Sequence, residues 1–550
     1  MIRRWATRFV AARGIFMSNA DAGPSITGAS SLLRTMAAAG IEVCFANPGT
    51  SEMHFVSALG ALPQIRPVLG LFEGAVSGMA DGYARVTGKP AMTLYHLGTG
   101  FTNAAANLHN ARRAKSPIVN VVGDHATTHK RWDSPLKSDI EALARPMSDW
   151  LRMAQSTDTL SADAAAAVAA ARQAPGQIAT LILPADIAWG KTQGHAQPLA
   201  APSPVAPDPA AVSRVAKALR ERGRSCALIV RAAAGDARGV AALQRICAAT
   251  GARALHDLMA PRVLRGANQF AITRVAYRAE EAVALLTGLS DVVHVGTMPP
   301  IAPFAYPQFP SWLTPEGVNL IWLAHEHEDE VLALEALADA LGAPAMAATY
   351  GAPGAGARDA AIANSPRGAL DAATIGRSLA RHLPEGTILS EEAISNGPPI
   401  AAGTALAAPH SHMTNTGGAL GQGIPLATGA AVAAPNRKVV NVQADGSAAF
   451  TLQALWTQAR EQLDVLTIIL ANRSYAVLRF EIARVGAQVQ EQLAGNLLDI
   501  DRPDIDWVSL AKGMGVEATR VSTAEAFDDV LAAMLKQRGP KLIEAVLAHP

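Results

Sequence analysis

The residues whose types and spacing are best suited to ligand binding lie in the last third of the chain, in the segment VVNVQADGSAAF. Asp445, Gly446 and Ser447 follow an apolar run typical of a buried strand, and Asn472 follows the next such run, 27 residues later. That separation is enough for one helix and one returning strand, so both runs would end side by side. A carboxylate and an amide oxygen suit a hard cation such as Mg²⁺. Gly446 would let the backbone approach a phosphate, to which Ser447 and a helix N-terminus would donate hydrogen bonds.

Each half of this pattern has an ordinary structural alternative, because Asp-Gly and Asn are both common in turns. The spacing and the strand-end context together favour a diphosphate and metal site. Polar residues also recur at the ends of apolar runs in the first third of the chain: residues 47–50, Glu73, His96 and Asp124. Ligands bind at the carboxyl ends of strands in open parallel sheets, so we expect a second group of site residues there.

The elements that must position these residues follow the pattern of repeated βαβ units. Short apolar runs such as IEVCFAN, PAMTLYH, SCALIVRA, DVVHVG and DVLTIIL alternate with helical patterns throughout the chain. The expected helices include residues 74–87, 102–114 and 451–462. This alternation predicts parallel sheets with helices between the strands.

Two stretches rich in Pro, Ala and Gly are expected to be linkers, residues 190–208 and 342–367, and the second has no periodicity that would support a helix or strand. They divide the chain into three parts of ordinary domain size. The predicted fold is therefore an α/β fold of three open parallel-sheet domains, at residues 18–190, 205–342 and 368–550.

The composition describes a soluble, well-packed protein. Half of the 550 residues are apolar, 17% are charged and the formal net charge is +1, so nothing favours a nucleic-acid or membrane partner. There is no uninterrupted apolar run of about 18 residues. Three well-separated cysteines fit neither a disulfide framework nor a zinc site, and we expect a cytoplasmic protein. The basic residues 1–16 are either an organelle targeting segment or an overextended start, with Met17 opening the folded protein.

The segment ADGS with its downstream Asn resembles the diphosphate-binding motif of thiamine-diphosphate enzymes, usually written GDG, with Ala444 in place of the first Gly. NPGTSEMHF, FEGAVSGMADGYARVTGKP and GGALGQGIP follow in the family order. From about Ser18 onward, the chain is similar to benzoylformate decarboxylase and to acetolactate synthase large subunits, and it looks closest to an acetolactate synthase-like branch. The resemblance implies thiamine diphosphate and Mg²⁺ as cofactors.

The resemblance also implies roles for single residues around the cofactor. Glu73 matches the glutamate whose carboxyl group lies against the aminopyrimidine ring, although a surface glutamate at a helix N-terminus is the structural alternative. Leu420 takes the place of the bulky apolar residue that bends the cofactor, and a core leucine is its alternative. The carbonyl of Gly418 would accept the cofactor amino group.

For the metal, the resemblance implies three ligands: Asp445, Asn472 and the backbone carbonyl of Ser474. Gly446 and Ser447 would then contact the diphosphate. Together these residues imply a site that holds the cofactor through Mg²⁺ at the ends of two strands.

His96 falls on the active-site histidine of benzoylformate decarboxylase, and Thr50 falls where that enzyme has a substrate-contacting serine. A neutral imidazole there could move a proton or guide an incoming carbonyl, whereas a histidine satisfied within its own loop is the alternative.

Four further histidines have weaker implications. His125 and His129 have the spacing of a metal pair on a helix but lack a third ligand nearby, so a loop is expected. His410 and His412 precede the glycine-rich loop without a defined role.

The chain departs from both relatives in its substrate region. Phe304 and Tyr306 lie near the place where benzoylformate decarboxylase has a second histidine, which is not evident here. The segment after Asn472 lacks the tryptophan-bearing stretch of acetolactate synthases, and their Gly-Met-His-Gly-like motif is missing. We therefore expect no FAD in the middle domain.

The resulting expectation is an enzyme that decarboxylates a small 2-oxo acid, with or without joining the remaining fragment to a second carbonyl compound. Benzoylformate decarboxylase-like chemistry is the alternative within this class, and a catalytically silent cofactor-binding paralogue is the alternative outside it. The presence of Glu73, Asp445 and Asn472 argues against the silent paralogue. A dehydrogenase is disfavoured because no strand opens into GxGxxG. The family places its active site between subunits, which implies a homodimer or homotetramer.

Overall fold

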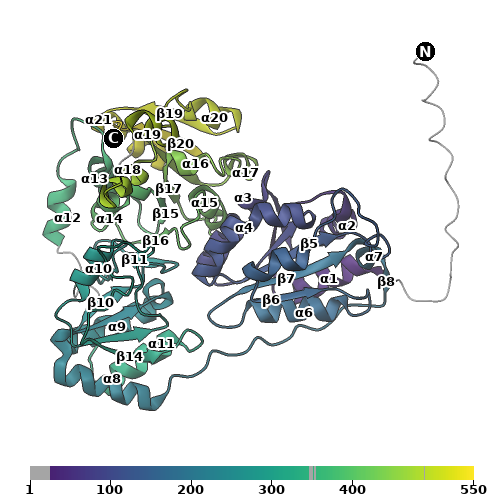
Figure 1. Cartoon of the computed structure of the whole chain (residues 1–550), viewed down its shortest axis with the longest axis horizontal. Helices are drawn as coiled ribbons and strands as arrows, with labels where there is room; N and C mark the ends of the chain where they lie inside the picture. Colours follow the sequence, from purple (N-terminus) through teal and green to yellow (C-terminus); the bar gives the residue numbers. More distant parts are fainter. Residues whose placement is uncertain (1–24, 346–350, 352–354, 488–489) are drawn as a thin grey trace.

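The computed structural model describes residues 25–345, 351, 355–487 and 490–550, which form three α/β bodies (Figure 1). The N-terminal body is purple to blue, the middle body is teal, and the C-terminal body is green to yellow. In the described part of the chain, no helix is long and apolar enough to cross a membrane. The basic segment 1–16 and Met17 lie outside the described residues.

The N-terminal sheet has six parallel strands in the order β3-β2-β4-β5-β7-β6. Its four central strands, β2, β4, β5 and β7, are almost wholly buried, as expected for a parallel sheet covered by helices on both faces. The strands are β2 (Val43–Asn47), β3 (Arg66–Leu69), β4 (Ala91–Tyr95), β5 (Ile118–Asp124), β6 (Trp150–Met153) and β7 (Ile178–Pro184). The helices are α1 (Gly28–Ala38), α2 (Met53–Gly60), α3 (Glu73–Thr87), α4 (Leu97–Ala114), α5 (Ile140–Ala144), α6 (Leu160–Ala171) and α7 (Ala185–Trp189).

Two local expectations for this sheet were inaccurate. Strand β3 ends at Leu69, so Glu73 does not close a strand and is instead the first residue of α3. Helix α4 begins at Leu97, five residues before the expected start, because its glycine-containing first turn folds as helix directly after the extended residue His96. Glu73 therefore lies at the N-terminus of α3, and His96 lies directly before the N-terminus of α4.

The middle sheet has five parallel strands in the order β12-β10-β9-β13-β14. The expected runs SCALIVRA and DVVHVG form β9 and β13 at its centre, whereas β10 and β12 were not predicted. The strands are β9 (Cys226–Val230), β10 (Arg253–His256), β12 (Thr273–Arg274), β13 (Asp291–Val295) and β14 (Asn319–Ala324). The helices are α8 (Pro209–Arg222), α9 (Ala237–Thr250), α10 (Ala279–Leu286) and α11 (Glu330–Ala340).

The C-terminal sheet has seven strands in the order β11-β16-β15-β17-β18-β20-β19. Six of them are parallel, and the antiparallel edge strand β11 comes from the middle third of the sequence. The strands are β11 (Val263–Arg265), β15 (Ile388–Glu392), β16 (His410–Thr414), β17 (Val439–Ala444), β18 (Val465–Ala471), β19 (Glu517–Val521) and β20 (Lys541–Val546). The helices are α13 (Ala372–His382), α14 (Gly397–Thr404), α15 (Gly423–Ala433), α16 (Asp445–Ala448), α17 (Ala454–Arg460), α18 (Ala476–Arg484), α19 (Glu491–Leu498), α20 (Trp507–Gly513) and α21 (Ala524–Leu535).

The two expected linkers differ in structure. Residues 193–204 run without helix or strand along the lower side of the molecule, from the N-terminal to the middle body (Figure 1). The second segment contains helix α12 (Ala355–Ile362), so the expectation of no helix in residues 342–367 was wrong. Helix α12 packs beside α13, and Arg381 of α13 donates to the Ile362 carbonyl at its end. The contact with α13 therefore stabilises helix α12, whose local sequence pattern alone does not predict a helix.

Helices α3 and α15 join the N-terminal and C-terminal sheets through a glycine-mediated contact. A methyl group on Gly82 would lie 2.0 Å from the Leu426 carbonyl oxygen, and one on Gly429 would lie 1.9 Å from the Met79 carbonyl oxygen. Apolar side chains of both sheets share one buried cluster around this contact. Because each fully buried aliphatic side chain contributes about 1.5–3 kcal/mol, the contact holds the two sheets in one arrangement.

Candidate active site

The C-terminal sheet brings Asp445 and Asn472 to neighbouring strand ends, as the spacing predicts. Strands β17 and β18 are paired up to Ala444 and Leu470, and each is followed at once by a site residue. The Asp445 carboxylate accepts the backbone N–H groups of Gly446 (2.8 Å) and Arg473 (2.6 Å), so one side chain links both turns. Asp445 is only 2% exposed, and this burial raises its pKa to about 6.

The turn after β18 is held tightly around Asn472. Its side-chain oxygen accepts the backbone N–H of Ser474 (3.1 Å), and Arg473 between them has a left-handed backbone (φ +60°). The Ser474 hydroxyl donates to the Leu498 carbonyl (3.2 Å) and accepts from Arg479 (3.2 Å). The turn is therefore anchored to helices α18 and α19.

The residues at these two turns fit Mg²⁺ and a diphosphate. The side chains that project there are a carboxylate and an amide, both oxygen donors of the kind Mg²⁺ prefers. A methyl group on Gly446 would lie 2.5 Å from the Tyr475 ring, so a larger residue would have to displace that ring. Ser447 is buried in the same turn. The metal and diphosphate roles of these residues stay predictions.

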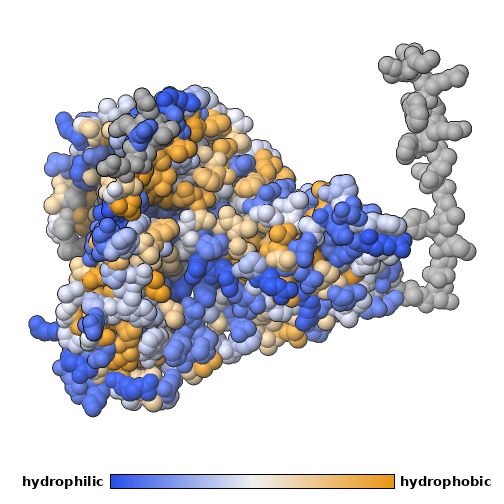
Figure 2. All heavy atoms as spheres, viewed as in Figure 1, coloured by the Kyte–Doolittle hydropathy of each residue, from blue (hydrophilic) through white to orange (hydrophobic). Residues whose placement is uncertain are grey.

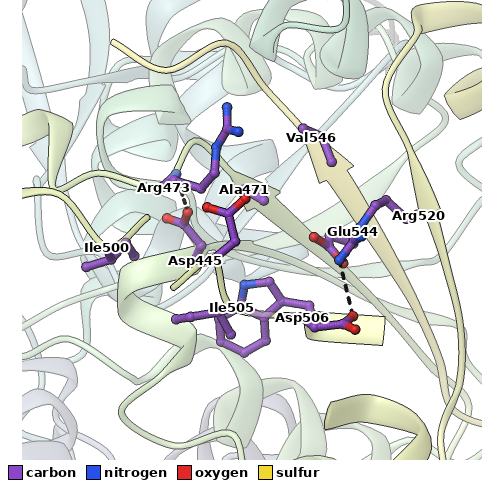
Figure 3. A pocket seen from close by; sticks show the side chains of 11 residues that line it. Asp445, Ala471, Arg473, Ile500, Ile505, Asp506, Arg520, Glu544 and Val546 are labelled. Carbon is purple, nitrogen blue, oxygen red and sulfur yellow. Dashed lines mark hydrogen bonds and ion pairs between the residues drawn. The ribbon is translucent and has the colours of Figure 1, made fainter. Parts of the chain in front are cut away.

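A cavity of about 300 Å³ borders Asp445 on the side of strands β18, β19 and β20. Figure 3 shows Asp445 and Arg473 on one side of it and Glu544 and Arg520 on the other. Arg520 lies between the carboxylates of Asp506 (3.2 Å) and Glu544 (3.0 Å). Asp445 is the member of the predicted site that lines this cavity.

The glycine-rich loop, residues 414–422, connects β16 to α15. Gly418 is exposed, has φ +81°, and has no atom within 4 Å of the position that a Cβ would take. Leu420 is half-buried rather than enclosed in a core. The backbone N–H groups of Gly417 and Gly418 donate to the Asn415 side chain (3.1 and 2.6 Å), which shapes the loop from within.

Glu392, at the end of β15, holds the same loop from the side of the sheet. Its buried carboxylate accepts the N–H groups of Gly421 (3.0 Å) and Gly423 (2.7 Å), together with the amides of Asn415 (3.2 Å) and Gln443 (2.7 Å). Burial raises the pKa of this carboxyl group. Sequence reasoning missed Glu392 because it did not predict β15, although a Glu-Glu pair closing the apolar run TILSEE was the available signal.

Glu73 is buried at the start of α3, against helix α4. Its carboxylate accepts the amide of Asn103 (3.0 Å), and a methyl group on Gly100 would lie 2.9 Å from one carboxylate oxygen. Asn107 of α4 donates both to the Gly74 carbonyl (2.8 Å) and to the Gly421 carbonyl (3.2 Å). The Glu73 end of α3 is therefore tied to the glycine-rich loop of the same chain.

His96 lies within hydrogen-bonding distance of a carboxylate that sequence reasoning missed. His96 Nδ1 lies 2.9 Å from Glu52 Oε2 and 3.2 Å from Ser51 Oγ. Glu52 is 3% exposed and also accepts the Gly49 N–H (2.8 Å). The imidazole is thus held at Nδ1, and 23% of its side chain stays exposed. The signal for Glu52 was its place in NPGTSEMHF, five residues after the strand end.

Thr50 is exposed in the short 3₁₀ helix Thr50–Glu52, next to Ser51, which contacts His96. The structure therefore brings together the two residues that the resemblance had linked to substrate. Their roles toward substrate stay predictions.

The other histidines have structural surroundings. His125 and His129 lie in a turn segment with ring centroids 5.4 Å apart, and His125 Nε2 contacts Ser134 (3.1 Å). Across the described ranges, no group of three or more His, Cys, Asp or Glu residues is arranged for a metal. His410 and His412 are buried on β16 where it pairs with β11, and burial lowers the pKa of His410 to about 3.

The middle sheet has its own strand-end crevice, between β9 and β13, where the chain order switches direction. The Glu330 carboxylate, from the start of α11, fills it. This carboxylate accepts the N–H groups of Arg231 (3.4 Å), Ala232 (3.3 Å) and Ala233 (2.9 Å). A methyl group on Gly296 would lie 2.1 Å from it. The backbone donors of this crevice are therefore already used by a side chain of the same chain.

Comparison with known proteins identifies the family. Residues 26–144 match the description "Thiamine pyrophosphate enzyme, N-terminal TPP binding domain", and residues 395–545 match "Thiamine pyrophosphate enzyme, C-terminal TPP binding domain". The chain is 46% identical over 523 residues to the "Putative acetolactate synthase large subunit IlvX" of Mycobacterium tuberculosis, covering 95% of this chain and 99% of that protein.

Two further similarities extend over most of the chain. The benzoylformate decarboxylase of Pseudomonas aeruginosa is 29% identical over 530 residues, which is 92% of this chain and 96% of that protein. The fold is similar to that of the 4-hydroxybenzoylformate decarboxylase of Rhodococcus jostii, with a TM-score of 0.81, 24% identity, and coverage of 96% of this chain and 100% of that one. The chain therefore belongs to the thiamine-pyrophosphate-dependent enzyme family, in the group that contains acetolactate synthase large subunits and benzoylformate decarboxylases.

Proposed function

We propose that the protein uses thiamine diphosphate and Mg²⁺ to decarboxylate a small 2-oxo acid and to join the remaining fragment to a second carbonyl compound, as an acetolactate synthase-like enzyme. The observation that supports this most directly is the pair of turns at Asp445 and Asn472, joined by the hydrogen bond from the Arg473 N–H to the Asp445 carboxylate (2.6 Å). A buried carboxylate beside an amide oxygen, at two paired strand ends, suits a cation that carries a diphosphate.

In this proposal, Asp445, Asn472 and the Ser474 carbonyl hold Mg²⁺, and Gly446 and Ser447 contact the diphosphate. When bound, thiamine diphosphate supplies the nucleophilic carbon and the electron sink that allow a 2-oxo acid to lose CO₂. Binding and orientation are the tasks of the chain's own residues. The open side of Gly418 and the half-buried Leu420 leave room at the loop for the body of the cofactor.

Glu73 is assigned the proton exchange with the pyrimidine ring of the cofactor. Its carboxylate is buried, and Asn103 holds it at one oxygen (3.0 Å). A carboxyl group shielded from solvent and held at one oxygen can exchange a proton with a ring nitrogen rather than with water.

His96 is assigned a role toward substrate, because Glu52 holds its Nδ1 and leaves Nε2 for chemistry. Thr50 lies in the same loop and is assigned a contact with substrate. In this arrangement Glu52 orients the ring and His96 holds or moves a proton at Nε2.

Plain decarboxylation of an aryl 2-oxo acid is the second candidate, and it rests on a specific observation. The similarity to benzoylformate decarboxylase covers 92% of the chain, whereas the similarity to the acetolactate synthase large subunit of Buchnera aphidicola covers 22%. The filled crevice of the middle sheet agrees with this alternative, and we propose that the protein works without FAD.

We also propose three domains at residues 18–190, 205–342 and 368–550, with the active site between two copies of the chain in a homodimer or homotetramer. Figure 2 shows apolar residues gathered on the upper part of the molecule, over the C-terminal sheet. Exposed apolar side chains lie on the segments that follow the two turns of the predicted site: Phe450, Leu478, Phe480 and Leu497. A surface of this kind beside the site favours a partner subunit.

The test is to incubate the protein with thiamine diphosphate and Mg²⁺, first with pyruvate and then with benzoylformate, and to follow the products by NMR. Acetolactate from pyruvate supports the first candidate, and benzaldehyde from benzoylformate supports the second. The matched variant is Glu73→Gln, which should abolish turnover and retain Mg²⁺-dependent cofactor binding. Undiminished turnover in Glu73→Gln would exclude the role assigned to Glu73.

A further inference from the structure

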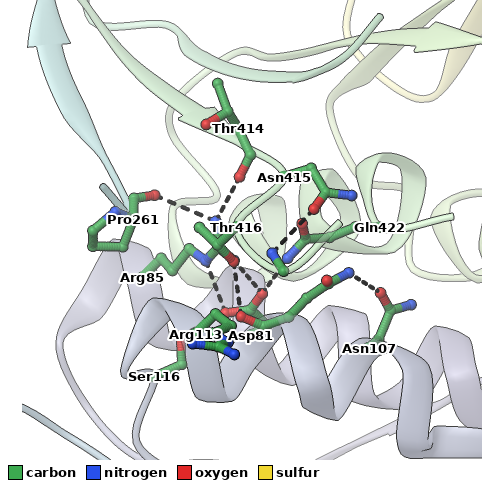
Figure 4. Close-up of polar contacts among 12 residues, drawn as sticks. Asp81, Arg85, Asn107, Arg113, Ser116, Pro261, Thr414, Asn415, Thr416 and Gln422 are labelled. Atoms are coloured by element: carbon green, nitrogen blue, oxygen red, sulfur yellow. Dashed lines mark hydrogen bonds and ion pairs between the residues drawn. The ribbon is translucent and has the colours of Figure 1, made fainter. Parts of the chain in front are cut away.

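Helix α3 contains a second buried carboxylate, Asp81, eight residues after Glu73. Asp81 is 0% exposed and accepts four hydrogen bonds: from Arg85 Nε (2.8 Å) and Nη2 (2.6 Å), from Ser116 (2.5 Å) and from Gln422 (2.6 Å). Gln422 belongs to the glycine-rich loop of the C-terminal sheet. The helix that presents Glu73 therefore also contacts that loop through a charged group (Figure 4).

Arg85 extends this contact along the loop. Its guanidinium donates to the Thr416 hydroxyl (2.7 Å) and the Thr414 carbonyl (2.9 Å), while it stays paired with Asp81. Its side-chain head is almost fully buried. One planar cation thus connects the carboxylate of α3 to the first residues of the loop, which a lysine could not do with its single nitrogen.

The loop is also held by α4, independently of this pair. Asn110 donates to the Ala419 carbonyl (2.8 Å) and accepts the Ala419 N–H (3.1 Å), and His109 contacts the Gly417 carbonyl (3.1 Å). The loop therefore lies between two N-terminal helices and Glu392 of its own sheet. With both ends held, Gly418 and Leu420 have a defined position relative to α3.

We propose that Asp81 and Arg85 are positioning residues for the glycine-rich loop and set the placement of Gly418 and Leu420 within the C-terminal body. A buried ion pair contributes little net stability compared with apolar packing. The hydrogen bonds that Asp81 accepts, and those that Arg85 donates to the loop, are therefore better explained by a positioning role. Asp81 lies about 12 Å along the helix from Glu73 and acts through the loop. This inference rests on the proposed function, since it assumes that the loop contacts the cofactor.

The test compares Arg85→Lys with Arg222→Lys, a control in the middle sheet where the arginine pairs with the buried Asp291 (2.8 Å). Backbone hydrogen exchange is measured across residues 414–422 without cofactor, and thiamine diphosphate affinity is measured with Mg²⁺. Arg85→Lys should speed exchange in the loop and weaken cofactor affinity about tenfold, as expected for one lost charged hydrogen bond. Arg222→Lys should change neither quantity.

A second variant keeps the test decisive if Arg85→Lys folds poorly. Thr416→Val leaves the ion pair on α3 intact and removes the hydroxyl that accepts from Arg85 and donates to the Asn110 carbonyl (2.7 Å). It should show the same two changes at smaller size. Unchanged loop exchange and unchanged affinity in both variants would overturn the proposal. A wild-type protein that binds no thiamine diphosphate would refute the proposed function instead, and loop exchange would still report on the pair.

Discussion

Two turns of this molecule follow central strands of parallel sheets and yet differ in what they hold. After β17, Asp445 turns its carboxylate back onto the N–H groups of Gly446 and Arg473 and borders a cavity. After β9, the N–H groups of residues 231–233 are taken by Glu330, a carboxylate from another helix. The same architecture thus offers backbone donors twice. At one turn the neighbouring Asp445 accepts them beside a cavity, and at the other a carboxylate from a distant helix fills the crevice.

The N-terminal sheet shows an intermediate case. Glu52 fills the space above Gly123 of β5, where a methyl group would lie 1.7 Å from its carboxylate. Unlike Glu330, it also contacts an ionisable partner, His96 (2.9 Å). A carboxylate in a strand-end crevice can therefore close the crevice or orient a reactive group beside it.

The strongest test of the comparison removes one carboxylate from each turn. Asp445→Ala should weaken Mg²⁺-dependent thiamine diphosphate binding by at least about 100-fold, because the proposed metal ligand and the link between the two turns are both lost. Glu330→Ala should leave this affinity unchanged. Titration of each variant with cofactor at constant Mg²⁺ measures both, and equal losses would show that the two turns are not functionally distinct.

A second test asks whether Glu330 serves as an internal anion. Glu330→Ala leaves three buried N–H groups without their acceptor, which should lower the free energy of unfolding by about 1–3 kcal/mol. Added formate should restore part of the loss in the variant and have no effect on the wild type. Denaturant unfolding with and without formate gives the result, and a variant as stable as the wild type would contradict this role.

A third test concerns the crevice that holds Glu52. Glu52→Gln should lower kcat about tenfold, because the carboxylate that orients the His96 ring is lost. Cofactor affinity should not change, because Glu52 belongs to the N-terminal sheet, whereas the Asp445 turn belongs to the C-terminal sheet. Steady-state kinetics on the substrate identified by NMR provides the measurement, with Glu330→Gln in the middle crevice as the matched control. A fall in cofactor affinity in Glu52→Gln would argue for a structural role.

The smallest expected effect is on the pH dependence of stability. Burial raises the pKa of Glu330 to about 7, from 4.5 for the unfolded chain. Between these values the folded protein binds a proton that the unfolded chain has released, so this group should make stability fall as pH rises from about 4.5 to about 7. Glu330→Gln should remove this component. Thermal unfolding of the cofactor-free protein at several pH values, compared between the two proteins, would detect it.

The sequence by itself determined the α/β class, the family and the placement of Asp445 and Asn472 at paired strand ends. Those features depend on local apolar runs and on spacing within one βαβ unit, which the order of residues reports directly. Local reasoning was less accurate where a turn decides the boundary, as at Glu73, His96 and α12.

Only the tertiary structure decided the contacts that join distant segments: Glu52 with His96, Glu392 with the glycine-rich loop, Glu330 in the middle crevice, and Asp81 with Arg85 against Thr416 and Gln422. The pairing of β11, from the middle third of the sequence, with β16 is another contact of this kind. These contacts join residues that are tens to hundreds of positions apart. They depend on how helices and sheets pack, which residue spacing along the chain does not encode.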